Sequence, residues 1–588
     1  MNHRWEVLYL TRNQNTILRL FSYLKKYRLL ITIALILTFV SNYLALLIPN
    51  YSGKAIDAIG VNENVDFSLI FINCKYMLAC VILSALLSYA TEVLLIRIST
   101  HITEDMREEL FEHLQTLPIS FFDQHQVGDI ISRISYDIDT INTSLSSDLI
   151  TLLTTIITVV GSFIMMIKIS PIMCSIFLIT CPMIIAITKH RAKKVRPLFS
   201  KRSRLLGELN GFVEEMLSGQ KTIKAYAAED SIISRFDKNN KDAVDAYYEA
   251  EYQGSIVGPT VTWINNLSLA LVSGLGAFLF VLQKISIGNI SSFIMYSRKF
   301  SGPISETANI MSELQSCISA ANRVFHMMDE PSEIADDSDA IILNNVKGDV
   351  SFENVHFSYV KNKEVIHGID LNAQSGKMIA IVGPTGAGKT TIINLLMRFY
   401  DVDSGSIKID GHDIVHCTRE SLRKQFSMVL QDTWLFEGTI FENVAYGSDK
   451  ATKEDVINAC KAAHIHDFIM SLKDGYETIL VDDGINISKG QKQLLTIARA
   501  MLADAKMLIL DEATSNVDSY TEQEIQAAIR NLCKDKTTFV IAHRLSTIEE
   551  ADEILVLQHG TIIEHGTHTE LLKQKGFYSS LFNAQWTN

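Results

Sequence analysis

Long stretches without a charged residue constrain the fold of this chain more than any other feature. Residues 29–49, 149–167, 169–188 and 252–283 contain no Asp, Glu, Lys or Arg. Each stretch is largely apolar and long enough for a helix to cross the hydrocarbon core of a bilayer, and residues 252–283 are longer than one span requires. These four stretches therefore predict membrane-spanning helices.

Two weaker segments raise the predicted number of spans to six. Residues 76–91 are apolar but slightly short, which is acceptable if the charged side chains that bracket them extend to the membrane surface. Residues 285–310 form the weakest span, because they contain three charged residues and a proline that would kink a helix: Arg298, Lys299, Glu306 and Pro303. A cation facing lipid is costly. We therefore expect Arg298 and Lys299 to face a cavity or a polar partner, unless the span is shorter and both lie near its end.

The distribution of basic residues predicts the orientation of the spans. Six Lys and Arg residues precede the first span, whereas residues 51–67 contain one Lys against three acidic residues. The positive-inside rule then places the N-terminus in the cytoplasm, together with the long charged loops at residues 96–146 and 189–251. Residues 16–28 alternate apolar and basic residues at helical spacing. This pattern fits a helix lying on the membrane surface or an extension of the first span.

Composition excludes several other classes. The chain has 588 residues, of which 47% are hydrophobic and 20% charged, so we expect more than one domain and membrane segments. A net charge of −13 argues against a nucleic-acid partner. The eight cysteines form no C-x-x-C pair, so neither a zinc site nor a disulfide framework is indicated.

The second half of the chain contains a phosphate-binding pattern, G-x-x-x-x-G-K-T, at residues 383–390. The apolar residues 378–382 precede it as a buried strand would, and residues 391–397 follow with helical character. In such a loop the glycines let backbone N–H groups surround phosphate oxygens. Lys389 neutralises phosphate charge, and Thr390 offers a hydroxyl to Mg²⁺. The candidate residues are Gly383, Pro384, Thr385, Gly386, Ala387, Gly388, Lys389, Thr390 and Thr391.

A second part of a nucleotide site follows an apolar strand at residues 506–510. Asp511, at the strand end, can hold Mg²⁺ through water, and Glu512 can polarise an attacking water. The alternative, that these carboxylates only cap the strand, is disfavoured by the phosphate-binding loop in the same domain. From about residue 348, strands alternate with helical stretches, which predicts an α/β domain with a largely parallel sheet.

Between these motifs, Ser-Lys-Gly-Gln at residues 488–491 resembles the signature sequence of ABC transporters. Four further motifs resemble those of the family: the aromatic that stacks on adenine, the Q-loop, the D-loop and the switch histidine, at Tyr359, Gln431, residues 515–518 and His543. Residues 121–133 and 211–219 resemble the two intracellular loops of exporters. Singly, each motif has a structural alternative, such as a helix N-cap for Ser488. Their order around the phosphate-binding loop favours the family.

The resemblance implies a fold and its domains. We expect a membrane α-helical domain with six transmembrane helices of the exporter type, followed by an α/β P-loop ABC ATPase domain. The expected boundaries are a cytoplasmic segment with an interfacial helix (1–28), the transmembrane domain (29–325), a linker (326–347) and the nucleotide-binding domain (348–588).

The resemblance also implies residue roles. The catalytic residues would be Glu512, His543, Lys389 and Gln431. ATP would be bound by Tyr359, residues 383–391, Ser488, Gly490, Gln491 and Asp518, and Mg²⁺ by Thr390, Gln431 and Asp511. In the family two nucleotide domains meet head to tail, so Ser488 and Gly490 would contact ATP bound to a second chain. The protein is therefore expected to be a half-transporter that works as a dimer.

Lys489 bears on the identity of that second chain. The family signature has glycine at this position, yet Glu512 is intact. Together with residues 486–495 and 296–304, this combination resembles the glutamate-bearing subunit of bacterial heterodimeric multidrug exporters and predicts a different partner chain. A homodimer stays open if position 489 tolerates many residues.

The predicted function is ATP-driven export of hydrophobic or amphipathic substrates (drugs, lipids or peptides) across the plasma membrane. The N-terminus and the ATPase domain would be cytoplasmic. Two alternatives are a homodimeric lipid or peptide exporter and an ATP-gated regulator. Glu512 disfavours the regulator, because a pure switch does not need a base. The spans exclude a soluble DNA-repair ATPase.

Overall fold

The computed structural model describes residues 16–60, 65–430, 433–448, 450–481, 484, 486–511, 519–542 and 545–586. Within these ranges, the side chains of residues 303–309, 519–520, 546 and 585–586 are not described. The chain divides into two compact units. The first comprises Met1–Gln115 and Val127–Glu330, and the second comprises Thr116–Gln126 and Pro331–Asn588.

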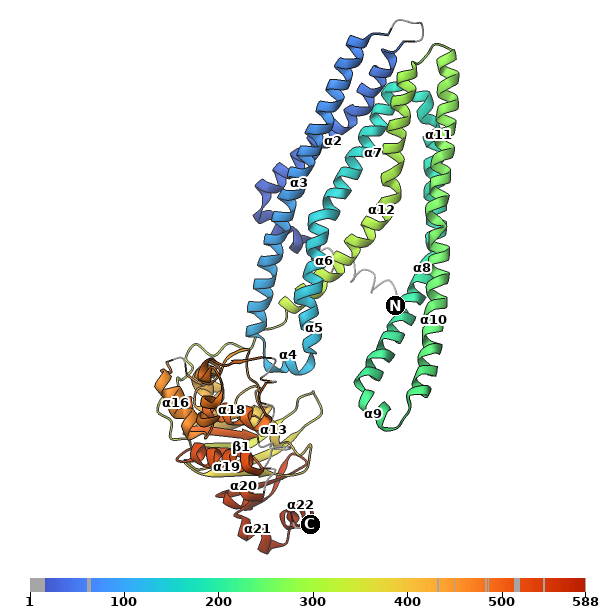
Figure 1. The fold of residues 1–588 in the computed structure, drawn as a ribbon. Coiled ribbons are helices and arrows are strands. Elements are labelled where there is room, and N and C mark those ends of the chain that lie inside the picture. Colours follow the sequence, from blue (N-terminus) through green and yellow to red (C-terminus); the bar gives the residue numbers. More distant parts are fainter. Residues whose placement is uncertain are drawn as a thin grey trace. The chain divides into compact units, whose positions relative to one another are not determined.

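The first unit is a bundle of long helices (Figure 1). In the described residues, five helical stretches are long and apolar enough to cross a membrane. They are Arg28–Asp57 (α2), Phe67–Thr116 (α3), Val127–Ile169 (ending in α7, Leu149–Ile169), Pro171–Ser218 (α8) and Glu229–Val281 (α10, Glu229–Ser255, with α11, Val257–Val281). They contain the first five predicted spans. The sixth predicted span lies in α12 (Ile287–Met328), which packs against α2 and α7.

The helix at residues 16–26 is separate from the first span. Tyr27 interrupts the helix before α2 begins at Arg28. Side chains fasten the short helix to the bundle: Arg19 pairs with Asp329 at 2.5 Å, and Lys26 pairs with Asp105 at 2.6 Å. The hydroxyls of Thr16 and Tyr23 donate to Asn322 and Glu109. A simple extension of the first span does not describe this segment.

A proline in α2 explains how α12 packs against it. Pro49 has no N–H, so it cannot donate to the carbonyl of Ala45 one turn earlier. Lys299 of α12 supplies the missing donor, with its Nζ 3.0 Å from the Ala45 oxygen. The neighbouring carbonyl of Leu46 accepts from the Tyr296 hydroxyl at 2.5 Å. Polar side chains of the weakest predicted span therefore satisfy backbone groups of the first.

We expected Arg298 and Lys299 to face a cavity or a polar partner. Lys299 has such a partner, the Ala45 carbonyl. Arg298 is exposed in this chain. Adjacent residues on a helix point in directions about 100° apart, so one can face a neighbouring helix while the other does not. The structure thus assigns a packing role to Lys299.

We expect the Lys299 contact to matter only while Pro49 is present. Lys299→Met should lower the free energy of unfolding by about 1 kcal/mol, because it leaves the Ala45 carbonyl without its donor. In a Pro49→Ala background the new N–H can donate to the same carbonyl, so the same substitution should have less than half that effect. Unfolding of the full chain in mixed micelles measures both values. Arg298→Ala is the matched control, and equal losses in the two backgrounds would contradict the explanation.

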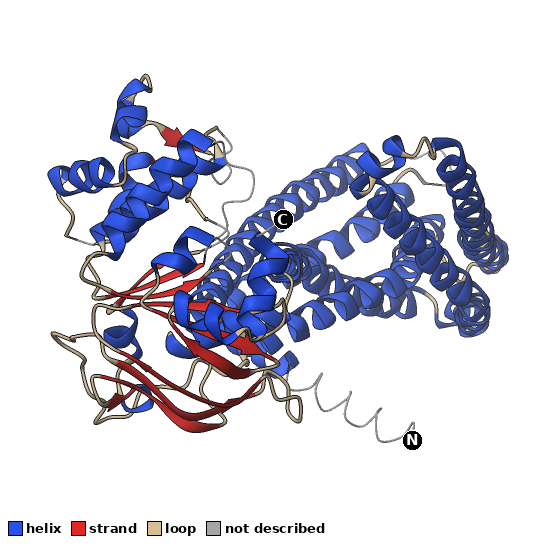
Figure 2. Ribbon diagram, turned by 90° about the horizontal axis from the view of Figure 1, so that it is seen from below, coloured by secondary structure: helices blue, strands red, loops and turns tan. Residues whose placement is uncertain are grey.

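Figure 2 shows the strands of the second unit in red. Its largest sheet has six strands, in the order β12-β11-β3-β10-β9-β6. All neighbouring strands are parallel except the edge pair β11 and β12. The strands are β3 (Met378–Val382), β6 (Phe426–Val429), β9 (Met507–Asp511), β10 (Thr537–Ile541), β11 (Glu553–Gln558) and β12 (Thr561–Gly566). A four-stranded antiparallel sheet has the order β2-β1-β4-β5: Ile366–Ala373, Val350–Phe357, Ser404–Ile409 and His412–Asp413. A short pair, β7 (Gly438–Thr439) and β8 (Ile479–Leu480), completes the strands of the described residues.

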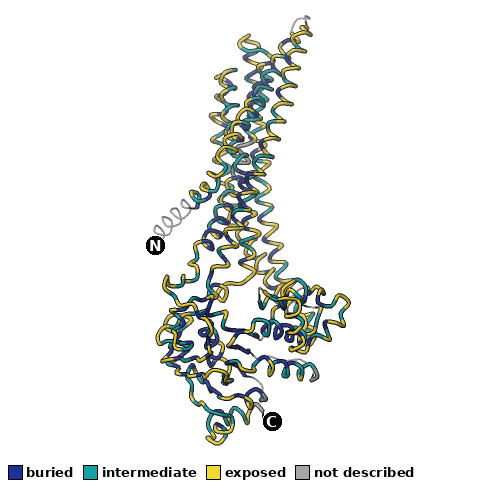
Figure 3. The backbone as a smooth tube through the Cα atoms, turned by 90° about the vertical axis from the view of Figure 1, so that its left-hand side faces the viewer, coloured by how far each residue is buried: buried dark blue, intermediate teal, exposed yellow. Residues whose placement is uncertain are grey.

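Figure 3 shows buried stretches of the chain inside the second unit. Both faces of the six-stranded sheet are covered, so β10 is buried along its whole length and β9 is buried up to Asp511, which is half-buried. Alternate residues of β3 belong to two different cores. Ala380 and Val382 pack in the core that contains α18 (Lys489–Leu502) and α19 (Ser519–Cys533), whereas Ile379 and Ile381 pack in the core shared with the antiparallel sheet and α13 (Lys389–Leu396). Strand β3 thereby fixes the loop that follows it between two packed layers.

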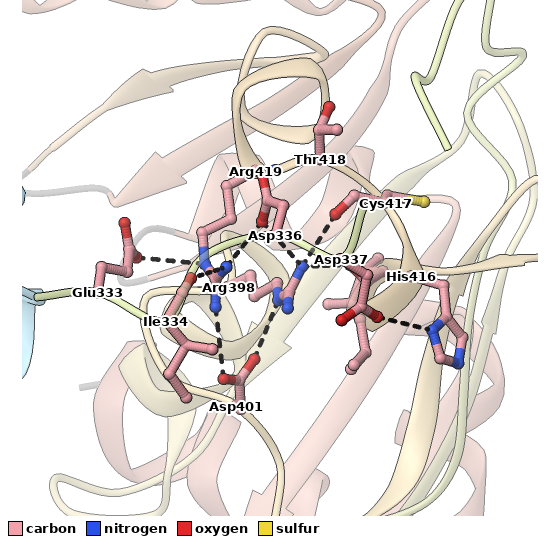
Figure 4. Close-up of polar contacts among 12 residues, drawn as sticks. Glu333, Ile334, Asp336, Asp337, Arg398, Asp401, His416, Cys417, Thr418 and Arg419 are labelled. Carbon is pink, nitrogen blue, oxygen red and sulfur yellow. Dashed lines mark hydrogen bonds and ion pairs between the residues drawn. The ribbon is translucent and has the colours of Figure 1, made fainter. Parts of the chain in front are cut away.

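The segment after α12 is fastened to the second unit by a cluster of ion pairs (Figure 4). The buried guanidinium of Arg419 pairs with Asp336 at 2.7 Å and with Glu333 at 3.4 Å. Arg398, also buried, pairs with Asp401 at 3.0 Å, and Asp401 lies 3.6 Å from Arg419. Buried guanidinium groups need such partners. The expected linker is therefore held against the ATPase fold before β1 begins.

Candidate nucleotide-binding site

The predicted phosphate-binding loop connects β3 to α13. Gly386 and Gly388 have φ values of +81° and +103°, a region that glycine adopts without strain. A Cβ on Gly383 would lie 2.3 Å from the Leu557 oxygen, and one on Gly388 would lie 2.9 Å from Ile366 Cδ1. The glycines are therefore required by backbone conformation and by close neighbours. The loop can present its N–H groups to a phosphate at the start of α13.

Lys389 is held within this loop. Its side chain is 9% exposed, and its Nζ donates to the carbonyl oxygens of Gly383 at 2.8 Å and Pro384 at 3.1 Å. Burial lowers the pKa of Lys389, and the carboxylate of Asp511 opposes that shift. The ammonium group is thus positioned beside the loop opening, where phosphate oxygens would replace the two carbonyls as its partners.

Asp511 ends β9 at the same level of the sheet as the end of β3. Its register partner is Ile541 of β10, which is itself paired with Ile381 of β3. Thr390 is exposed in the first turn of α13. A carboxylate and a hydroxyl beside a loop of backbone donors are oxygen ligands of the kind that Mg²⁺ prefers. The described residues therefore fit a nucleotide with Mg²⁺.

Tyr359 lies beside the start of α13. Its hydroxyl donates to Thr391 Oγ1 at 3.2 Å and accepts from Asn394 Nδ2 at 3.1 Å. Its ring makes edge contacts with Phe357 and Tyr400, at centroid separations of 4.8 and 4.9 Å. The side chain stays 39% exposed, so the ring is oriented by its neighbours and still accessible to an adenine base.

The predicted signature residues begin α18. Ser488 is the N-cap: its Oγ accepts from the Gln491 N–H at 3.3 Å, and the Gln491 side chain accepts from the Ser488 N–H at 2.8 Å. This capping box gives both residues a local structural role. Gly490 is buried, whereas Lys489 is exposed. The structure of one chain therefore leaves the helix start open to a second molecule.

Four predicted site residues lie outside the described residues: Gln431, Glu512, Asp518 and His543. Glu512 directly follows Asp511, and His543 directly follows Ala542. The strands that precede them, β9 and β10, are parallel neighbours. Their roles remain predictions.

Sequence reasoning did not connect Tyr400 with this site. Its ring contacts Tyr359, and its hydroxyl donates to Asp123 Oδ2 at 2.5 Å. Burial and the Asp123 carboxylate raise the pKa of Tyr400. Asp123 lies in α4 (Ile119–Gln124), within the short segment that belongs to the second unit. The sequence identified this segment as an intracellular loop, but spacing gave no signal that relates residue 123 to residue 400.

We expect two substitutions of Tyr400 to separate its two contacts. Tyr400→Ala removes the ring that orients Tyr359 and should weaken ATP binding about three- to tenfold, as aromatic pairs contribute about 0.5–1.5 kcal/mol. Tyr400→Phe keeps the ring and removes only the hydrogen bond to Asp123, so ATP affinity should stay within about twofold. Titration of the purified full chain with a fluorescent ATP analogue measures both. Equal affinity for the two variants would show that the ring contact does not orient Tyr359.

Comparison with known proteins agrees with this geometry. Residues 31–304 match the ABC transporter transmembrane region, and residues 366–515 match the ABC transporter family. The chain is 40% identical over 573 residues to the ABC transporter ATP-binding protein YfiC of Bacillus subtilis, covering 97% of this chain and 94% of that protein. The chain belongs to the ABC transporter family.

Two further similarities identify the branch of the family. The chain is 42% identical over 522 residues to the fatty acid ABC transporter ATP-binding/permease protein of Mycobacterium bovis, covering 89% of this chain and 82% of that protein. A solved bacterial Atm1-family ABC exporter with ATP bound superposes with a TM-score of 0.76 at 29% identity, covering 95% and 98% of the two chains. The protein is thus a multi-pass membrane half-transporter of the exporter type that binds and hydrolyses ATP to drive export. The predicted family, the enzyme class and the fold class of a helical membrane domain followed by an ABC ATPase domain are confirmed, whereas the count of six spans stays a prediction.

Proposed function

We propose that this ABC exporter moves hydrophobic or amphipathic molecules out of the cytoplasm across the plasma membrane. A cavity in the first unit carries the proposal. It has a volume of about 1110 Å³, slightly above the roughly 300–1,000 Å³ that is usual for ligand-binding cavities. Its walls are formed mainly by apolar side chains of α7, α8 and α11, including Ile156, Val160, Ile184 and Val261. Such a cavity suits a substrate with a large apolar surface.

Asn265 supplies a polar group in this cavity. Its Oδ1 is buried and, among the described residues, has no hydrogen-bond partner. A buried acceptor without a partner is costly. A turn of the Asn265 amide would bring this oxygen to the cavity surface, where a substrate that donates a hydrogen bond could satisfy it. The cavity wall therefore favours amphipathic molecules over plain hydrocarbons. Lipids, hydrophobic peptides and drugs share this chemistry, and the mycobacterial relative is named for fatty acids.

The residues of the nucleotide site support ATP hydrolysis as the energy source of the proposed export. Lys389 and the loop N–H groups would hold the phosphates, and Tyr359 would stack on the base. Thr390, Asp511 and Gln431 would hold Mg²⁺, which neutralises phosphate charge when bound. Glu512 would orient or deprotonate the attacking water, and His543 would contact the γ-phosphate. Ser488, Gly490, Gln491 and Asp518 would complete the site of a second chain.

Transport into inverted membrane vesicles tests the proposed substrate class. ATP should drive accumulation of an amphipathic dye, and Asn265→Leu should raise the apparent KM about two- to tenfold through loss of one hydrogen bond. The adjacent Asn266 is exposed and does not line the cavity, so Asn266→Leu is the matched control. ATP hydrolysis without dye accumulation would favour the ATP-gated regulator.

We further propose that the working dimer contains a different second chain. Lys489 is exposed in the first turn of α18, and the family resemblance would place this helix start beside ATP bound to that chain. A long cationic side chain there would change how the helix start approaches phosphate, and would make the two nucleotide sites unequal. Purification of this chain expressed alone decides between the assemblies. A stable dimer with two equally active sites, unaffected by Lys489→Gly, would establish a homodimer.

A further inference from the structure

An apolar groove lies between the short N-terminal helix, α2, α3 and α7, apart from the cavity described above. Its volume is about 610 Å³, and no residue lines both sites. Side chains from the four elements form its walls, among them Phe21, Leu35, Ile102 and Leu153. Phe21 and Leu35 are exposed. The groove is therefore open along part of its length in this chain.

Two cations stand at one end of the groove, Lys25 and Arg28. Both are exposed, and neither has an ion pair with another described residue. Their neighbours differ: Arg19 and Lys26 pair with Asp329 and Asp105. The paired cations fasten the helix to the bundle, and the unpaired ones face the groove opening.

The groove runs along the first predicted span. On α2 its lining extends from Arg28 to Thr38, which lie ten positions or about 15 Å apart along the helix. On α3, the contact of Asp105 with Lys26 marks the cationic end, and the lining continues from Ile102 to Leu95. The hydrocarbon core of a bilayer is about 30 Å thick, so one leaflet is about 15 Å. The groove thus has the length of one leaflet and has its cations at the predicted cytoplasmic surface.

We propose that this groove binds an anionic phospholipid of the cytoplasmic leaflet. One acyl chain would lie along the apolar wall, and the phosphate would accept hydrogen bonds from Lys25 and Arg28. Arginine binds phosphate in a fork geometry, and basic groups between transmembrane helices on the cytoplasmic side are suited to anionic headgroups. The occupant would link the N-terminal helix to the first three spans.

Native mass spectrometry of the purified, assembled transporter tests the proposal. Phosphatidylglycerol and phosphatidylcholine of the same chain length are titrated separately. We expect phosphatidylglycerol to bind at least about tenfold more tightly, and Lys25→Ala with Arg28→Ala to remove that preference. The exchanged pair, Lys25→Arg with Arg28→Lys, should retain it. Lys193→Ala with Lys194→Ala removes two exposed cations of α8 outside the groove and should have no effect.

A substitution in the groove tests whether an acyl chain lies along its apolar wall. Leu35→Trp fills the groove from an exposed position and should displace phosphatidylglycerol while both cations stay. Unchanged ATP binding and melting temperature establish that the variants are folded. Three results would overturn the proposal: equal binding of the two phospholipids, displacement of phosphatidylglycerol by equimolar palmitate, or no bound phospholipid because a partner helix fills the groove of the assembled dimer.

Discussion

Glu512→Gln is expected to lower steady-state ATP hydrolysis by at least about a hundredfold while ATP binding persists, because a positioned general base contributes about 10²–10⁴-fold to rate. Glu512 follows Asp511, whose carboxylate interacts with the Lys389 ammonium across the end of the sheet. The substituted amide keeps the shape of the side chain and loses the base. Phosphate release and equilibrium binding of labelled ATP measure the two effects separately.

A matched substitution guards against a general effect of lost charge. Glu454 is exposed in the first turn of α16 (Lys453–Ala462), so Glu454→Gln should leave hydrolysis within about twofold. Transport should follow hydrolysis and stop in the Glu512 variant. Near-normal turnover by Glu512→Gln would contradict the proposed role of this glutamate. It would favour the alternative, in which Asp511 and Glu512 only cap the strand.

Local sequence patterns were sufficient to predict those parts of the fold and site that are built from contiguous residues. The glycines of the phosphate-binding loop, the strand before it and the helix after it are contiguous in sequence, and the structure places them as predicted. The same holds for the first five spans, because a bilayer-length apolar run has few other stable states in a membrane. Ser488 shows the limit of this reasoning. Its capping box involves neighbouring residues of the same chain and is seen in the structure. Its predicted signature role involves ATP bound to a second chain, which the structure of one chain does not test.

Contacts between distant residues could not be predicted in the same way. The sequence predicted that Lys299 would face a cavity or a polar partner. Its partner is the Ala45 carbonyl, which lacks a backbone donor because Pro49, some 250 positions before Lys299, has no N–H. The pairing of Tyr400 with Asp123 likewise depends on which loop packs on the ATPase fold. Such pairs follow from helix packing and register, which hydrophobic periodicity does not encode.

Lys389→Ala is expected to weaken ATP binding about ten- to a hundredfold and to reduce hydrolysis by about 10²–10³-fold. Each hydrogen bond to a charged group contributes about 1.5–3 kcal/mol, and loss of one preorganised donor costs a rate factor of that size. Nearly all of the Lys389 side chain is buried, and two loop carbonyls hold its ammonium group in place. The ammonium group therefore needs little rearrangement to meet phosphate oxygens. In the alanine variant, mobile water would be a poorer partner for those oxygens than this fixed charge.

Two controls separate this role from the folding of the loop. Lys389→Arg keeps the charge but brings a larger planar group into a buried position, so it should recover ATP binding only in part. Lys377 precedes β3 at the opposite end of that strand and pairs with Asp552 at 2.9 Å, so Lys377→Ala should leave binding within about twofold. If Lys389→Ala bound ATP normally, the loop N–H groups alone would account for phosphate affinity, and the buried ammonium group would act only to hold the Gly383 and Pro384 carbonyls in place.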